Sequence, residues 1–267
     1  MTHNIIKSNW RWNAQVFLRL IHRDMIVLRP RMLSRTFNIA WWTALCVYTF
    51  QYIGLGPVAG CGLFIAASEC ASKGFMRVFP NAGRIVADLH GGPQSLLYYL
   101  TLPIAQWLVF AAIAVSTTLE LMAIDIFVLP VAKLVLGSSF QLSCMGFVKV
   151  GCIFFCSHLF FGSCVLLLAS MANSMEELNP VYSRFIHPLF WAGGYLFTWH
   201  TLYTKSRIFA CINLCNPLVY AFEGMRSAIF GMPESLPVWL CCVVLLAFTA
   251  LVGTVGTRRM MKKVDCL

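Results

Sequence analysis

The side chains most capable of chemistry stand singly in apolar sequence. Each of four ionisable residues has mainly hydrophobic neighbours: Glu69, Glu120, Asp125 and His158. Such groups could relay protons or serve an enzyme that acts inside a membrane. We consider them too dispersed along the chain to form one site. We expect Glu69 to pair with Lys73 one helical turn later, and Glu120 and Asp125 to lie at a membrane interface.

Motifs for the common hydrolytic chemistries are absent. The chain has no HExxH for zinc, no GxSxG for a serine nucleophile and no GxxxxGK[ST] phosphate loop. It therefore offers no catalytic residues, and ATP hydrolysis would need another chain. The twelve cysteines lie mostly in apolar segments without CxxC pairs, and we interpret them as small core residues. We interpret His158, His187 and His200 as packed or interfacial residues, and we expect no metal site.

One segment near the C-terminus combines helix signals with charge. Residues 216–226 read Asn-Pro-Leu-Val-Tyr-Ala-Phe-Glu-Gly-Met-Arg, too polar to cross a bilayer and too apolar for a solvated loop. Pro217 suits a first helical turn, Glu223 and Arg226 can pair, and Gly231 would end the helix. Irregular backbone survives at membrane depth only where protein or a water-filled cavity satisfies it. We expect a re-entrant helical hairpin within about 200–235, with a gate formed by Asn216, Pro217, Tyr220, Glu223 and Arg226.

Composition sets the class. Of the 267 residues, 59% are hydrophobic and 11% charged, and the mean hydropathy is +0.75, values typical of a polytopic membrane protein. We predict an all-α protein with six transmembrane helices, at residues 37–53, 58–75, 104–124, 147–172, 181–199 and 238–257.

Charge distribution sets the orientation. The formal charge of +10 reflects topology better than nucleic-acid binding, because most of the 20 lysines and arginines fall in the N-terminal segment, alternate loops and the C-terminal tail. Both termini are therefore expected in the cytoplasm, and a bacterial inner membrane is expected to hold the chain. Seven basic residues among the first 35 also argue against a cleavable signal.

The N-terminal segment has an amphipathic pattern. Apolar residues recur at helical spacing between Trp10 and Leu28, with basic and polar residues largely opposite. This predicts a helix along the cytoplasmic membrane interface, in contact with membrane lipid, although a docking helix for a soluble partner fits equally well. We therefore divide the chain into an interface segment, 1–35, and a permease domain, 36–267.

The order of these features resembles the membrane-spanning subunit of type-2 ABC exporters, nearest to the permeases for polysaccharide, glycolipid and drug export. Three elements carry the resemblance. They are Arg23-Asp24 before the first span, Gly-Pro-Gln-Ser-Leu-Leu-Tyr-Tyr-Leu-Thr-Leu-Pro at 92–103, and Asn-Pro-Leu-x-Tyr…Glu-x-x-Arg at 216–226.

The resemblance implies a homodimer that docks two separate ATPase subunits, which bind the ATP and Mg; this chain would bind no cofactor. It implies a coupling helix at 92–103, a smaller contact at 174–179 and a clamp by the N-terminal helix. The implied ATPase-coupling residues are Arg23, Asp24, Gly92, Pro93, Leu96, Tyr98, Tyr99, Pro103, Glu176 and Glu177. The chain departs from the family in lacking a strongly charged run just before this helix.

The expected fifth span is rich in aromatic residues that could guide sugar rings: Phe190, Trp191, Tyr195 and Trp199. Core packing or lipid contact explains such residues equally well. The segment His187-Pro-Leu-Phe190 resembles the fifth span of polysaccharide and glycolipid export permeases, and this resemblance implies a glycan or lipid-linked amphiphile as cargo. Alternatives are a drug or lipid exporter, or an intramembrane enzyme acting on a lipid-linked substrate. A secondary transporter would need midplane charge pairs and internal repeats, which the sequence does not show.

Overall fold

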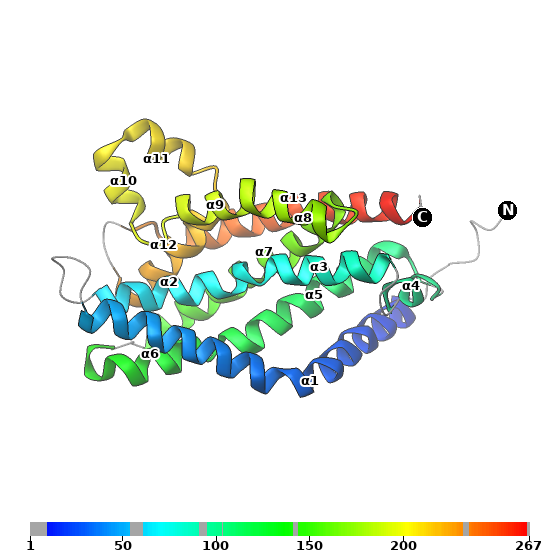
Figure 1. Ribbon diagram of the computed structural model, residues 1–267, viewed down its shortest axis with the longest axis horizontal. Helices are drawn as coiled ribbons and strands as arrows, with labels where there is room; N and C mark the ends of the chain where they lie inside the picture. The colour runs from blue at the N-terminus through cyan, green and yellow to red at the C-terminus, as the bar shows by residue number, and fades with distance from the viewer. Residues whose placement is uncertain are drawn as a thin grey trace.

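The computed structural model describes residues 10–53, 61–90, 95–102, 104–140, 144–231 and 235–265. These residues are almost entirely helical and contain no strand, so the expected all-α class is confirmed. Figure 1 shows an elongated bundle in which the long helices run roughly side by side.

The first helix joins two segments that the sequence analysis separated. Helix α1 runs without interruption over Trp10–Tyr48, with Pro30 inside it, and continues as a π-helical turn, Thr49–Ile53. Figure 1 shows α1 bent, as an internal proline requires because it removes a hydrogen bond and crowds the preceding turn. The N-terminal amphipathic segment and the first expected span are thus one helix, and the boundary at residue 35 falls within it. Residues 54–57, expected to link the first and second spans, lie outside the described residues.

The next helices form the middle of the bundle. Helix α2 covers Cys61–Met76 and α3 covers Val78–Leu89. A break at Arg77 separates them, and Pro80 sits in the first turn of α3, where a proline is tolerated. A short helix, α4, covers Ser95–Leu100, and α5 covers Gln106–Asp125.

Helix α6 (Val128–Leu136) ends in a 3₁₀ turn (Gly137–Ser139), and α7 covers Cys144–Met171. Helix α8 (Met175–Val181), a π-helical segment (Tyr182–Ile186) and α9 (His187–Ala192) then follow without a break. This helical run corrects the fifth expected span, 181–199: it begins earlier, because Ser174 caps it, and it ends before Gly194, whose φ is +94°. The polar stretch 173–180, which the sequence predicts as the turn between the fourth and fifth spans, therefore starts a helix instead.

Four helices complete the chain. Helices α10 (Trp199–Lys205) and α11 (Arg207–Asn213) form a hairpin that projects sideways from the bundle in Figure 1. Helix α12 (Pro217–Phe230) is bent 97° away from α11. The last helix, α13, covers Val238–Asp265.

Among the described residues, two helical stretches are long and apolar enough to cross a membrane: Gly146–Met171 in α7 and Val238–Asp265. The bent pair of α11 and α12 would be a third if it crosses as one unit. In the most apolar stretch of α7, 72% of the residues are buried inside the bundle, whereas in the most apolar stretch of α13 only 11% are buried. Helix α7 is therefore the central helix, and α13 presents most of its apolar surface outwards, as expected of a helix facing lipid.

One end of the bundle gathers three distant segments. The start of α1, helix α4 and the end of α13 lie together at the right of Figure 1. Gln106 at the start of α5 donates to Asp265 at the end of α13 (3.5 Å), and Lys263 donates to the carbonyl of Ala169 near the end of α7 (3.1 Å). The first site described below lies at this end.

Candidate functional site

Helix α4 is attached to α1 by a polar contact. The Tyr99 hydroxyl donates to Asp24 Oδ1 at 2.5 Å, and the Arg23 guanidinium lies 4.7 Å from the centre of the Tyr99 ring. Tyr99 itself is buried. The structure thus brings together three residues implied by the resemblance, and directs Asp24 inwards onto α4.

Helix α4 is also attached to α3. The Leu96 amide donates to Asp88 Oδ2 at 2.6 Å, so the carboxylate near the end of α3 binds one of the free N–H groups at the start of α4. Leu96 is buried, whereas Tyr98 is 59% exposed. Asp24 and Asp88 therefore fix one side of α4 while Tyr98 remains on its outer side.

The remaining members of the expected coupling set lie apart or outside the description. Gly92, Pro93 and Pro103 fall outside the described residues. Glu176 and Glu177 are exposed at the start of α8, where Glu177 accepts a hydrogen bond from the amide of Asn173 (2.7 Å). Helix α8 packs against α3 rather than α4.

Burial and hydrogen bonding protect the proton of Tyr99. Burial raises the pKa of the Tyr99 phenol above its ordinary value, and the hydrogen bond to Asp24 raises this pKa further. The neutral phenol is thus the form that the folded protein favours, and it is the form that can donate to Asp24.

A cleft of about 420 Å³ opens between α1, α3, α4 and α5. Apolar side chains such as Val27 and Ile113 form part of its wall, and polar groups form the rest: Asp24, Arg31, Asn81, Arg84, Asp88, Tyr99, Thr117 and Glu120. Asp24 and Asp88, the two anchors of α4, therefore border the same cleft.

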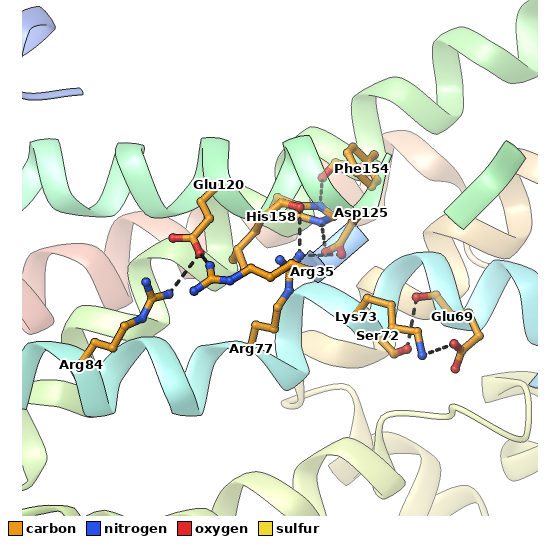
Figure 2. A network of polar contacts seen from close by, with 11 residues as sticks. Arg35, Glu69, Ser72, Lys73, Arg77, Arg84, Glu120, Asp125, Phe154 and His158 are labelled. Carbon is orange, nitrogen blue, oxygen red and sulfur yellow. Dashed lines mark hydrogen bonds and ion pairs between the residues drawn. The ribbon is translucent and has the colours of Figure 1, made fainter. Parts of the chain in front are cut away.

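Glu120 lies between two arginines from different helices. Its Oε1 atom forms ion pairs with Arg35 of α1 and, at 3.1 Å, with Arg84 of α3. Figure 2 shows the carboxylate between these two guanidinium groups. Glu120 is buried inside the bundle, and because a carboxylate is costly to bury alone, the surrounding helices supply cations to it. Its position at a membrane interface stays a prediction.

Asp125 is fully buried at the end of α5, and its position at a membrane interface also stays a prediction. Its Oδ1 lies 2.5 Å from Arg77 Nη2, and its Oδ2 lies 3.0 Å from Nε2 of His158 (Figure 2). The Nδ1 of His158 lies 2.7 Å from the carbonyl oxygen of Phe154, which can only accept, so the network assigns a proton to Nδ1. This group links α5 to α7 and to the junction of α2 and α3. His158 is a packed residue, as expected.

The expected pair of Glu69 and Lys73 is confirmed as an ion pair one turn apart on α2. Glu69 also accepts a hydrogen bond from the Tyr195 hydroxyl at 2.5 Å. The carboxylate is buried and therefore holds the turn after α9 against α2.

Arg226 is the most enclosed charge of α12. It is completely buried and lies 3.3 Å from Glu223 Oε1. Its guanidinium donates to the carbonyls of Gly194, Tyr195 and Phe197 and to the hydroxyl of Ser68. Glu223 also accepts the amide of Trp199 at 3.0 Å. The expected pairing of Glu223 with Arg226 is confirmed. The contacts of these two residues hold the irregular chain between α9 and α10 against α2.

The other expected gate residues shape the start of α12. Asn216 caps the helix by accepting from the Leu218 amide (3.1 Å) and donates to the carbonyl of Leu189 (2.7 Å). Pro217 occupies the first turn, and the Tyr220 hydroxyl donates to the carbonyl of Leu214 at 2.9 Å. Gly231 ends the helix in the left-handed conformation, as expected. A role in gating stays a prediction.

The expected pathway aromatics divide into two groups. Phe190 and Tyr195 are buried, with ring centres 5.2 Å apart, and Phe190 stacks on Phe75 of α2. Trp191 is 46% exposed. Trp199 is partly buried, and its indole nitrogen donates to the carbonyl of Ala210 (3.0 Å). Only Trp191 therefore presents a largely open ring, and a role of these residues in transport stays a prediction.

The sequence analysis did not predict the three arginines that bind the buried acids: Arg35, Arg77 and Arg84. It also did not predict that Asp88 binds the amide of Leu96 in α4. The sequence analysis assigned these three arginines no acidic partner. An available signal was the presence of acids within apolar helices, because each needs a cation or a donor nearby. The sequence alone does not identify which cation, since the partners are far apart along the chain.

An all-helical chain with apolar helices of membrane-spanning length and buried ion pairs defines a multi-pass membrane protein. Comparison with protein families identifies the particular one: residues 97–230 match the family model described as ABC-2 type transporter. The chain belongs to this family and is a membrane permease of an ABC transport system, a transporter subunit rather than an enzyme in itself. ABC-2 permeases work with an ABC ATPase partner and usually dimerise. A comparison with curated proteins found no match.

Proposed function

We propose that this chain forms half of an export pathway powered by a separately encoded ATPase that docks on α4. Two copies would form the pathway, and the ATPase would bind the ATP and Mg. The observation that carries this proposal is the attachment of α4: Asp24 and Asp88 fix it to α1 and α3, and Tyr98 remains exposed. A short helix fixed to two long ones moves with them as a unit.

The bundle end that holds α4 is proposed to face the cytoplasm. The start of α1 and the end of α13 lie at this end (Figure 1), and both segments are rich in basic residues, as positive-inside orientation requires. This arrangement supports the assignment of both termini to the cytoplasmic side of a bacterial inner membrane.

We further propose six crossings, with α11 and α12 as a re-entrant unit before the last one. The 97° bend between these helices supports the re-entrant unit. The Glu223–Arg226 pair would stabilise it, because buried Arg226 satisfies three backbone carbonyls that water could not reach. Opening of a gate here would require those contacts to separate.

The proposed cargo is a glycan or a lipid-linked amphiphile. Trp191 supports this choice because its ring, 46% exposed and bonded through the indole nitrogen to His187 one turn earlier (3.1 Å), gives a flat apolar surface on which a sugar ring or an acyl chain can pack. A drug or a lipid would use the same surface.

The test is copurification of the full chain with its ATPase from native membranes. Tyr98→Asp should reduce the recovered ATPase about ten-fold or more, because a charge placed in a packed contact is costly. The control Tyr98→Phe keeps the ring and should retain the complex. Unchanged ATPase recovery with Tyr98→Asp, at equal membrane levels of the chain, would show that α4 is not the docking element.

A further inference from the structure

The two anchors of α4 lead, by separate helices, to the same carboxylate. We infer that Glu120 is the positioning residue through which movement of α4 reaches α5, and through α5 the interior of the bundle. This inference rests on the proposed role of α4 as the ATPase contact. It assigns to Glu120 a function distinct from that contact.

The first connection runs along α1. Tyr99 of α4 binds Asp24, and Arg35, three helical turns further along α1, binds Glu120. An interval of eleven residues returns almost to the same side of an α-helix. The two contacts therefore lie on nearly one side of α1, with the Pro30 bend between them.

The second connection runs along α3. The amide of Leu96 in α4 binds Asp88, and Arg84, one turn earlier in α3, binds Glu120 at 3.1 Å. Residues four apart lie on the same helix face. Arg84 also donates to the Asn81 carboxamide one turn further back, so its guanidinium is held in position by its own helix. Both connections therefore end on the same Oε1 atom of Glu120.

The cleft shows why these polar contacts are needed. It lies between α4 and the middle of α5, and Tyr99, Asp88 and Glu120 all line it. Helix α4 also contacts α5, and α1 packs along α5, but the cleft of about 420 Å³ lies between Tyr99 of α4 and Glu120 of α5, so these two residues are connected through the polar contacts of α1 and α3. The ion pairs of Glu120 close the cleft at its far side, and they connect both α1 and α3 to α5.

The next buried acid on α5 continues the connection. Asp125 binds Arg77 and His158, and His158 belongs to central helix α7. Displacement of α5 at Glu120 therefore acts on a helix already bonded to the core. Asp125 has no contact with α4 or its anchors among the described residues, so Glu120 is the point where the connection can be interrupted selectively.

The test compares the response of two helices in the complex of full chain and ATPase. Hydrogen exchange is measured with and without ATP and vanadate, which trap the ATPase in one state. In the wild type, α4 and α5 should both change. In Glu120→Gln, α4 should still change, whereas the change at α5 should fall about five-fold or more, the lower range for coupling between sites.

A stability effect must be separated from a coupling effect. Glu120→Gln leaves Arg35 and Arg84 close together without an anion and will itself weaken the fold. The triple variant Arg35→Gln, Arg84→Gln, Glu120→Gln removes all three charges, so folding should recover while the response of α5 stays low. Glu120→Asp, which keeps the charge, should restore part of that response.

The outcomes separate the two hypotheses. A full response of α5 in Glu120→Gln or in the triple variant, with α4 responding as in the wild type, overturns the role of Glu120 and leaves the proposed docking intact. Absence of any response at α4 in the wild type refutes the docking role of α4, and the inference about Glu120 fails with it.

Discussion

At the residue scale, four buried acids of the described residues, Glu69, Glu120, Asp125 and Glu223, are each matched by a cation from a defined position. Lys73 serves Glu69 from the same helix, whereas Arg35 and Arg84 serve Glu120 from two others. Because removal of one partner strands a buried charge, such pairs are sensitive to substitution even where their net contribution to stability is small. They therefore fix which helices lie together rather than supplying most of the folding energy.

Tyr99→Phe tests the contact between α4 and α1 at this scale. The variant keeps the ring beside Arg23 but loses the bond to Asp24, and should lower the free energy of unfolding by about 1 kcal/mol, since Asp24 is partly solvated. The measurement is the thermal midpoint of the purified chain in detergent.

The pH dependence of that difference follows from the raised pKa of Tyr99. A group whose folded pKa is raised contributes stability that is fully present below its ordinary pKa, 10.0 here, and is lost as pH rises through the folded value. The gap between wild type and Tyr99→Phe should thus be constant from about pH 7 to 9 and narrow above about pH 10. A gap that narrows below pH 9 would contradict this assignment.

Contacts between residues close in the sequence were predictable, whereas contacts between distant residues were not. The chemistry of α12 was predictable because its signals are local: Asn216 and Pro217 start the helix, Glu223 pairs with Arg226, and Gly231 ends it. The carbonyl partners of Arg226 were not predictable, because they lie about thirty residues away on a chain whose path depends on tertiary packing. Arg35 and Glu120 are 85 residues apart, beyond any local pattern.

At the element scale, helix α7 organises the bundle through close contacts with its neighbours. A Cβ atom at Gly162 would lie 2.6 Å from the Ala114 carbonyl oxygen of α5, so the two backbones approach more closely than any side chain allows. Small residues at such crossings are the usual means of tight helix packing in membranes. The start of the fifth span was predicted too late because the prediction followed the apolar sequence and did not use the helix-capping signals of Ser174 and Glu177.

Gly162→Ala is predicted to lower the free energy of unfolding by about 1–3 kcal/mol, because α5 must move away from α7. The matched control is Gly151→Ala in the same helix, where a Cβ would meet nothing within 4 Å. The control should be neutral or gain up to about 1 kcal/mol from helix propensity. Equal thermal midpoints for the two variants would contradict the close crossing of α5 and α7.

At the scale of the whole molecule, the arrangement joins a short helix at one end of the bundle to buried charges in its interior. The all-α class follows from composition and apolar periodicity. Composition and periodicity do not predict that the N-terminal amphipathic segment and the first expected span form one helix, since Pro30 beside arginines is equally typical of a helix boundary. The chain belongs to the ABC-2 type transporter family, whose permeases work with an ABC ATPase partner.

The most direct test places a photo-crosslinking amino acid at position 98 and, in a separate variant, at position 239. Tyr98 is 59% exposed on α4 and Trp239 is 69% exposed at the start of α13, so both are accessible, but the end of α13 rather than its start lies near α4. Irradiation of intact membranes should join position 98 to a chain that carries a phosphate loop, and position 239 should yield no such product. A phosphate-loop ATPase captured at 239 and not at 98, or at neither position, would contradict the account.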